Sequence, residues 1–132
     1  MTIVVDASFV VAALLEREPT RGWARSSLLA EQLIAPHHMP VETANILRRE
    51  VIARRISPEA ADAAHAYLLS LPAILYPHEP FAARIWQLRP NVTPYDAWYV
   101  ALAEAEGVDL ATLDRRLAAA PGVRCGFLLP PM

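Results

Sequence analysis

The sequence predicts an α/β fold, with a central, mostly parallel sheet of four to five strands flanked by helices. Three observations support this prediction. Short apolar segments alternate with longer segments whose apolar residues recur at helical spacing. Proline and glycine residues separate these segments. The 132 residues, 55% of them hydrophobic, suffice for one buried core, and no repeat or low-complexity linker divides them. We therefore expect a single domain over residues 1–132.

The first half of the chain should contain two of the strands. Residues 3–5 are a run of β-branched residues typical of a buried strand, and residues 33–36 form a second short apolar run. Helices are expected over 8–16 and 19–30, and a third begins near Pro40. Its predicted buried face consists of Val41, Ala44, Leu47 and Val51.

The second half continues the alternation. A helix starts at Ser57, a good capping residue, and should bury Ala61, Ala64, Leu68 and Leu71. A strand over 73–76 precedes a helix over 80–88. Pro94 opens another helix that ends at Gly107. The remaining elements are a strand over 110–112, a short helix from Asp114 and a final strand over 126–130.

Four acidic residues fall at comparable places in these elements. Asp6 ends the first strand, and Asp114 lies two residues beyond the strand at 110–112. Glu42 and Asp96 lie in the first turns of the helices that Pro40 and Pro94 open. Because ligands of parallel sheets bind beyond the carboxyl ends of the strands, we expect the four carboxylates at one edge.

Each of these acids, taken singly, could be only a helix cap that complements the helix dipole. Their convergence needs another explanation, since two carboxylates about 4 Å apart repel by ~4 kcal/mol at an effective dielectric constant near 20. A cluster of this kind requires protonation or a cation. Sites built from oxygen ligands alone favour Mg²⁺ or Mn²⁺.

Composition excludes several classes of protein. The single cysteine rules out a disulfide framework and a thiolate zinc site, and the absence of lysine rules out a P-loop and a receiver domain. A net charge of −2 gives no overall case for nucleic-acid binding, so basic surface must be local, with Arg115 and Arg116 beside Asp114 the best candidates. With no signal peptide or membrane span, we expect a cytoplasmic protein whose apolar surface is covered by a partner or a second copy.

Four segments carry a resemblance to a known family: "IVVDASFVVAALL", "PVETANILRR", "TPYDAWYVALAEAEG" and "LATLDRRL". In this order and spacing the chain resembles the PIN-domain ribonucleases, specifically the VapC-type toxins of bacterial toxin–antitoxin pairs. The resemblance implies an acidic site of Asp6, Glu42, Asp96 and Asp114, with Asp6, Asp96 and Asp114 as metal ligands. It also implies supporting roles for Ser8, Thr112 and Asn45.

The resemblance further implies endonucleolytic hydrolysis of RNA with Mg²⁺ or Mn²⁺, a VapB-like antitoxin partner and a homodimer. Glu42 or Asp114 is the expected general base. Segments 17–35 and 72–90 are expected to set substrate and partner choice. Two alternatives stay open: a catalytically silent PIN-like interaction module whose acids are caps, and a DNA-directed nuclease of the flap-nuclease group. His37 and His38 are expected in a loop, and Trp98 and Tyr99 in the core rather than stacked on bases.

Overall fold

Five short strands form one sheet in the order β3-β2-β1-β4-β5, and every neighbouring pair is parallel. The computed structural model describes all 132 residues. The strands are β1 Thr2–Val5, β2 Gln32–Pro36, β3 Ile74–Tyr76, β4 Asp109–Ala111 and β5 Phe127–Leu128. The predicted α/β fold is thereby confirmed, with a sheet that is wholly rather than mostly parallel.

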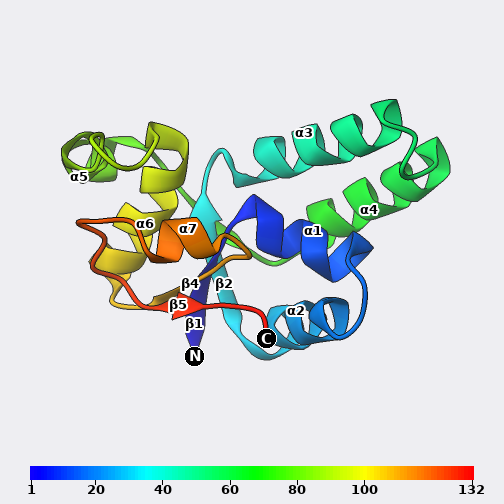
Figure 1. Cartoon of the computed structure of the whole chain (residues 1–132), viewed down its shortest axis with the longest axis horizontal. Coiled ribbons are helices and arrows are strands. Elements are labelled where there is room, and N and C mark those ends of the chain that lie inside the picture. Colours follow the sequence, from blue (N-terminus) through cyan, green and yellow to red (C-terminus); the bar gives the residue numbers. More distant parts are fainter.

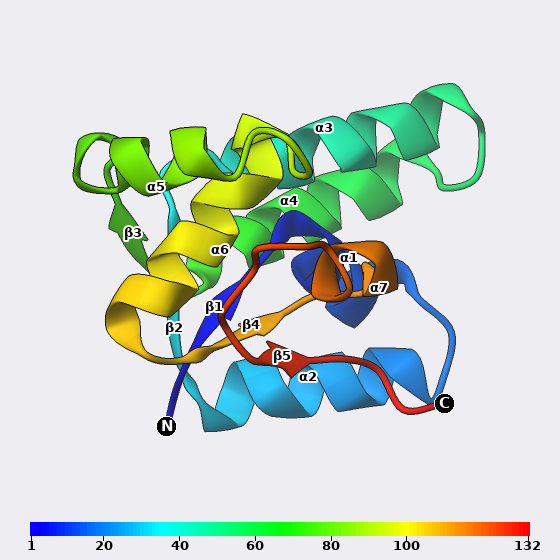
Figure 2. The same ribbon diagram turned by 60° about the vertical axis from the view of Figure 1, so that its left-hand side comes forward.

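Helices cover both faces of this sheet. Figure 1 shows α1 and α2 on one side and α6, backed by α5, on the other, while α3 and α4 form a pair that packs on α1. Figure 2 shows the starts of α1, α3 and α6 at the same end of the sheet. None of the helices combines the length and apolar character needed to cross a membrane. The helices are α1 Ala7–Leu15, α2 Thr20–Ala30, α3 Met39–Ile52, α4 Pro58–Ser70, the 3₁₀ helix η1 Glu79–Phe81, α5 Ala82–Gln87, α6 Pro94–Glu106 and α7 Arg115–Ala118.

The central strand β1 lies between β2 and β4 and is covered by helices on both faces. Its residues Val4 and Val5 are fully buried, which explains the unbroken run of β-branched residues in the sequence. On one side Phe9 of α1 meets the edge of Trp23 of α2 at a centroid distance of 5.2 Å. On the other side, the buried side chains of α6, including Val100 and Leu102, complete the core.

The predicted buried face of α3 is partly wrong. Val41 is 71% exposed, and the residues of this helix that are buried are Met39, Thr43 and Leu47. These three residues are spaced four apart and therefore lie on one helix face. A threonine is tolerated in this core position because its hydroxyl donates a hydrogen bond to the Met39 carbonyl at 2.9 Å. The polar type of Thr43 concealed this register in the sequence.

Two other predicted elements differ from their expected form. The helix expected over 80–88 is divided into η1 and α5, with Pro80 inside the first. The strand expected over 126–130 is reduced to Phe127–Leu128, because only these residues pair with β4 and Pro130 follows soon after. Neither change alters the order of the sheet or the position of its carboxyl edge.

A half-buried ion pair fixes α6 against its surroundings. The Arg84 guanidinium of α5 donates two hydrogen bonds to the Glu104 carboxylate, at 2.7 and 3.1 Å, and a third to the Gly122 carbonyl. The backbone N–H of Arg124 also donates to Glu104. Burial raises the pKa of Glu104, but these donors outweigh it and hold the pKa below its usual range. This cluster therefore ties α5, α6 and the C-terminal loop together.

We expect the change Glu104→Gln to lower the free energy of unfolding by about 1–3 kcal/mol at pH 7, because it leaves the half-buried Arg84 without its charged partner. The loss should shrink as pH falls through the depressed pKa of Glu104, since protonation removes the same charge from the native protein. Urea unfolding at pH 7 and pH 3.5 measures both effects. Glu106→Gln, at an exposed position of the same helix, is the control, and equal losses from the two changes would contradict the prediction.

Candidate functional site

The chain topology brings three strand ends together. β2, β1 and β4 are neighbours, and each leads within a few residues into the start of a helix, α3, α1 or α7. The chain crosses from β3 on one side of β1 to β4 on the other, which makes this edge the topological switch point of the sheet. A cavity of about 200 Å³ opens there. It is lined by Asp6, Ala7, Ser8, Glu42, Asn45, Ile46, Arg49, Asp96, Tyr99 and Asp114. The structure thus brings the four predicted acids together.

Asp6 is held more firmly than any of the other acids. Its Oδ1 accepts hydrogen bonds from the Ser8 hydroxyl at 2.7 Å and the Phe9 backbone N–H at 2.9 Å, and its Oδ2 accepts one from the Thr112 hydroxyl. Asp6 is therefore both the N-cap of α1 and a wall of the cavity. Burial raises its pKa to about 6, against these three hydrogen bonds and with a smaller contribution from the charge of Asp96.

Ser8 and Thr112 connect two strand ends through this carboxylate. The Ser8 hydroxyl also accepts from the backbone N–H of Leu113 at 3.1 Å, and the Thr112 hydroxyl accepts from the backbone N–H of Asp114 at 3.0 Å. The family resemblance implied supporting roles for both residues. In the structure both bind the carboxylate of Asp6, and in addition they fix the turn that carries Asp114.

Asp96 and Asp114 are more open. The Asp96 side chain makes no hydrogen bond within the chain, and burial, followed by the charges of Glu42 and Asp114, raises its pKa. Asp114 is exposed and caps α7, with Oδ1 accepting from the backbone N–H groups of Arg116 and Leu117. Each acid therefore keeps at least one oxygen free of protein partners.

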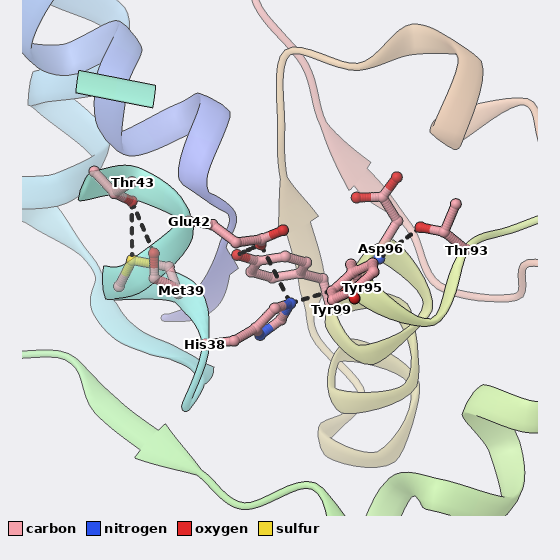
Figure 3. A network of polar contacts seen from close by, with 8 residues as sticks. All are labelled: His38, Met39, Glu42, Thr43, Thr93, Tyr95, Asp96 and Tyr99. Atoms are coloured by element: carbon pink, nitrogen blue, oxygen red, sulfur yellow. Dashed lines mark hydrogen bonds and ion pairs between the residues drawn. The ribbon is translucent and has the colours of Figure 1, made fainter. Parts of the chain in front are cut away.

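Glu42 belongs to a network that the sequence did not reveal (Figure 3). Its Oε1 accepts a hydrogen bond from the Tyr99 hydroxyl at 2.6 Å and lies 3.2 Å from Nε2 of His38. That same nitrogen lies 2.9 Å from the Tyr95 carbonyl. Burial, followed by the hydrogen bond and charge of Glu42, raises the pKa of Tyr99 far above its usual range, so the phenol remains a donor. A signal was present in the four-residue spacing of His38 and Glu42, which places them on one helix face.

The remaining polar and basic residues differ in whether they line a cavity or make contacts elsewhere in the chain. Asn45 is exposed and lines the cavity, one turn beyond Glu42. The Arg115 guanidinium donates to the Pro130 carbonyl, so it anchors the C-terminal segment. Arg116 lines a second cavity of about 370 Å³, which shares Asp96 and Asp114 with the first. Arg49, which was not among the predicted site residues, also lines the first cavity.

The expectation for the aromatic residues of α6 holds. Tyr99 is only 1% exposed and Trp98 is half-buried, so both belong to the packed interior rather than to an open stacking surface. His37 and His38 form the turn between β2 and α3, as expected for a loop position. The His38 side chain also packs against α6, because its ring stacks on Trp98 at a centroid distance of 4.5 Å.

The donor set fits a hard divalent cation. Four carboxylates line one cavity, and no arginine forms an ion pair with any of them. Burial is the main cause of the raised pKa values of Asp6 and Asp96, and the charges of neighbouring carboxylates add to it. No three acidic, histidine or cysteine side chains stand close enough together to enclose an ion as they are, so binding requires the more open acids to turn inward.

Comparison with known families and structures identifies relatives of this chain. The PIN domain family matches residues 3–123. Ribonuclease VapC1 of Mycobacterium tuberculosis is 47% identical over 130 residues, which cover 96% of each protein. The crystal structure of Mycobacterium tuberculosis VapC20, described as a Sarcin-Ricin loop cleaving toxin, has a TM-score of 0.69 and 22% identity, covering 98% of this chain and 99% of that one.

The structure of VapBC2 from Rickettsia felis, bound to a DNA fragment from the promoter, has a TM-score of 0.71 and 11% identity and covers 99% of this chain and 100% of that one. At these identities the two solved structures show a shared fold. The family match over residues 3–123 and the 47% identity to VapC1, over nearly the whole length of both chains, also show family membership. This chain belongs to the PIN-domain family, among the VapC-type ribonucleases.

Proposed function

We propose that this chain is the toxin of a VapBC-type pair, an endoribonuclease that hydrolyses RNA phosphodiester bonds with Mg²⁺ or Mn²⁺. One observation carries the proposal: four carboxylates from four separate segments line a single cavity and are not neutralised by any arginine. Caps alone would not need to converge, because each helix start could be satisfied independently. The similarity to ribonuclease VapC1 supports the reaction class.

The residues divide into distinct roles. Asp6, Asp96 and Asp114 would hold the cation, with Ser8 and Thr112 keeping Asp6 in place. When bound, a divalent cation at such a site activates water for attack on phosphorus and neutralises charge on the leaving oxygen. Glu42 and Asp114, which both line the cavity, are the two candidates for the general base that takes a proton from the attacking water.

RNA can follow a track defined by two arginines. Arg49 lines the first cavity and Arg116 the second, while Asp96 and Asp114 border both. Neither guanidinium forms an ion pair or hydrogen bond within the chain, so both can bind phosphates on either side of the acids. This refines the expectation for Arg115 and Arg116, since the Arg115 guanidinium is occupied by Pro130.

The changes Arg49→Ala and Arg116→Ala should each weaken RNA binding by about tenfold, and each should reduce the salt slope of binding by about 0.7, the value for one phosphate of a single strand. Binding is measured with the Asp96→Asn background, which leaves the RNA intact, over a series of salt concentrations. Arg55→Ala is the control because Arg55 pairs with Glu50 at 2.8 Å. Unchanged affinity and slope in both variants would rule out the track.

A small antitoxin is the proposed partner, and a homodimer the proposed form of the toxin. The surface supports both, since several large apolar side chains are exposed on α3, α4 and β3. They are Val41, Ile52, Leu69, Ile74 and Leu75. The solved VapBC2 complex of Rickettsia felis, which shares the fold, supports a partner of this kind.

The direct test is cleavage of total bacterial RNA by the purified chain in the presence of Mg²⁺, Mn²⁺ or EDTA. Cleavage to discrete fragments that requires the cation and stops with EDTA is the expected result. Absence of cleavage under all conditions would overturn the ribonuclease function and favour the silent interaction module. Cleavage of DNA in preference to RNA would favour the flap-nuclease alternative.

A further inference from the structure

The helices α3 and α6 carry two of the four site acids, and the hydrogen bonds that link them are confined to one small network (Figure 3). Tyr99 of α6 donates to Oε1 of Glu42 on α3. His38, the residue at the start of α3, contacts both this oxygen and the Tyr95 carbonyl of α6. No other hydrogen bond joins the two segments. All the hydrogen bonds that connect α3 and its first turn to α6 therefore come from His38 and Tyr99.

Both contacts converge on one oxygen of Glu42. Tyr99 is a donor to it because its buried phenol retains its proton. Nε2 of His38 lies between two acceptors, the Tyr95 carbonyl and the Glu42 carboxylate, and must therefore carry a hydrogen. Oε2 of Glu42 has no hydrogen bond in the chain, and it is not among the buried polar atoms that lack partners. One oxygen is thus fixed by two contacts, and the other has none within the chain, on a residue that lines the cavity.

The His38 ring is placed at a cost to the fold. It stacks on Trp98 with an interplanar angle of 8°, and it lies 4.9 Å from the Tyr99 ring. Its Nδ1 and the Nε1 of Trp98 are buried without hydrogen-bond partners, an arrangement that destabilises a folded protein. Nor does the side chain cap α3, where no capping hydrogen bond is made. In return, this placement brings Nε2 to the Glu42 carboxylate and the Tyr95 carbonyl.

We propose that His38 and Tyr99 are positioning residues that hold Oε1 of Glu42, so that Oε2 faces the attacking water of the cleavage reaction. The inference rests on the proposed ribonuclease function. It goes beyond that function by assigning Glu42, rather than Asp114, as the general base, and by naming the two groups that orient it. The proton of the water passes to Oε2 as the water oxygen bonds to phosphorus. The bond from phosphorus to the leaving ribose oxygen breaks, and that oxygen takes a proton from solvent, while Oε1 keeps its two donors throughout.

The first test is Tyr99→Phe, which removes the donor and keeps the ring. We expect kcat to fall by about tenfold or more, with KM unchanged within about twofold, because the lost contact acts on the chemical step. In a Glu42→Gln background the same change should have no further effect on kcat, since it acts through Glu42. Affinity for Mn²⁺, measured by calorimetry without RNA, should stay within about twofold of the unmodified protein, because Glu42 is not assigned to the ion.

The second test concerns His38. His38→Ala should lower kcat by about tenfold, and His38→Gln, whose amide can donate from a similar position, should restore it to within about threefold. The matched control is Tyr67→Phe, at a half-buried tyrosine of α4 whose hydroxyl makes no hydrogen bond within the chain. It should cleave at the original rate.

A readout independent of activity is the order parameter of the Glu42 side chain, from ¹³C relaxation of the metal-free protein. It should fall in Tyr99→Phe and His38→Ala and remain high in His38→Gln. An unchanged order parameter would overturn the positioning role, as would a wild-type kcat in Tyr99→Phe or equal losses with and without Glu42. Failure of the unmodified protein to cleave RNA would instead overturn the proposed function, and the order parameter would still decide the role of the two residues.

Discussion

The change Asp96→Asn should reduce RNA cleavage by about 10²–10³-fold or more, because it removes one charge from the set that would hold the cation. The substitution is close to isosteric, and the Asp96 side chain makes no hydrogen bond or ion pair that it would break. The fold should therefore be unaffected. Cleavage of total RNA by purified protein, together with the growth rate of cells in which expression is induced, measures the effect.

A matched control is Asp62→Asn on α4. This aspartate is exposed and forms no hydrogen bond or ion pair through its side chain. It should cleave RNA and slow growth as the unmodified chain does. Equal cleavage by Asp96→Asn, or cleavage that survives EDTA, would exclude the carboxylate site. An inactive unmodified chain with an intact fold would favour the silent module.

The second large effect concerns stability and pH. At pH 7.5 in EDTA, Asp6→Asn should raise the free energy of unfolding by about 1–3 kcal/mol, since the buried carboxylate carries an uncompensated charge. The folded protein raises the pKa of Asp6 from 3.8 to about 6. The contribution of this group is fully present below about pH 4 and is lost as pH rises through about 6, where the native carboxyl ionises.

The asparagine oxygen can still accept from Ser8 and the Phe9 backbone, so the cap of α1 is kept. Urea unfolding at pH 4, 6 and 7.5 should show the two proteins diverging as pH increases. Added Mn²⁺ should then stabilise the unmodified protein at pH 7.5 and leave Asp6→Asn nearly unaffected, because only the carboxylate gains from the ion. A stability difference that is constant across this pH range would contradict the prediction.

The sequence predicted the convergence of the four acids better than it predicted which helix residues are buried. The four acids could be located because each follows a strand or opens a helix, and these positions are marked by Pro40, Pro94 and short apolar runs. Parallel topology then brings such positions to one edge. Burial within α3 could not be read in the same way, because Thr43 is polar by type and becomes a core residue only through its bond to Met39.

The groups that support the acids were only partly predictable. Ser8 and Thr112 could be proposed because the resemblance to the PIN-domain ribonucleases implies supporting roles for them. The pairing of Tyr99 with Glu42 joins residues 57 positions apart, and local spacing says nothing about such a contact. The roles of the arginines could not be predicted for a related reason. Only the folded chain shows that Arg49 lines the cavity and that Arg115 donates to the Pro130 carbonyl.

The position of β1 between β2 and β4 also has a consequence for synthesis of the chain on the ribosome. Asp6 and Glu42 emerge early, but Asp96 and Asp114 follow only after most of the chain has been made. Until β4 emerges, β1 lacks a neighbour on one side, and Asp6 lacks the hydroxyl of Thr112. A nascent or prematurely terminated chain that ends before residue 114 therefore cannot assemble the acidic cavity, so the proposed cleavage of RNA requires a nearly completed molecule.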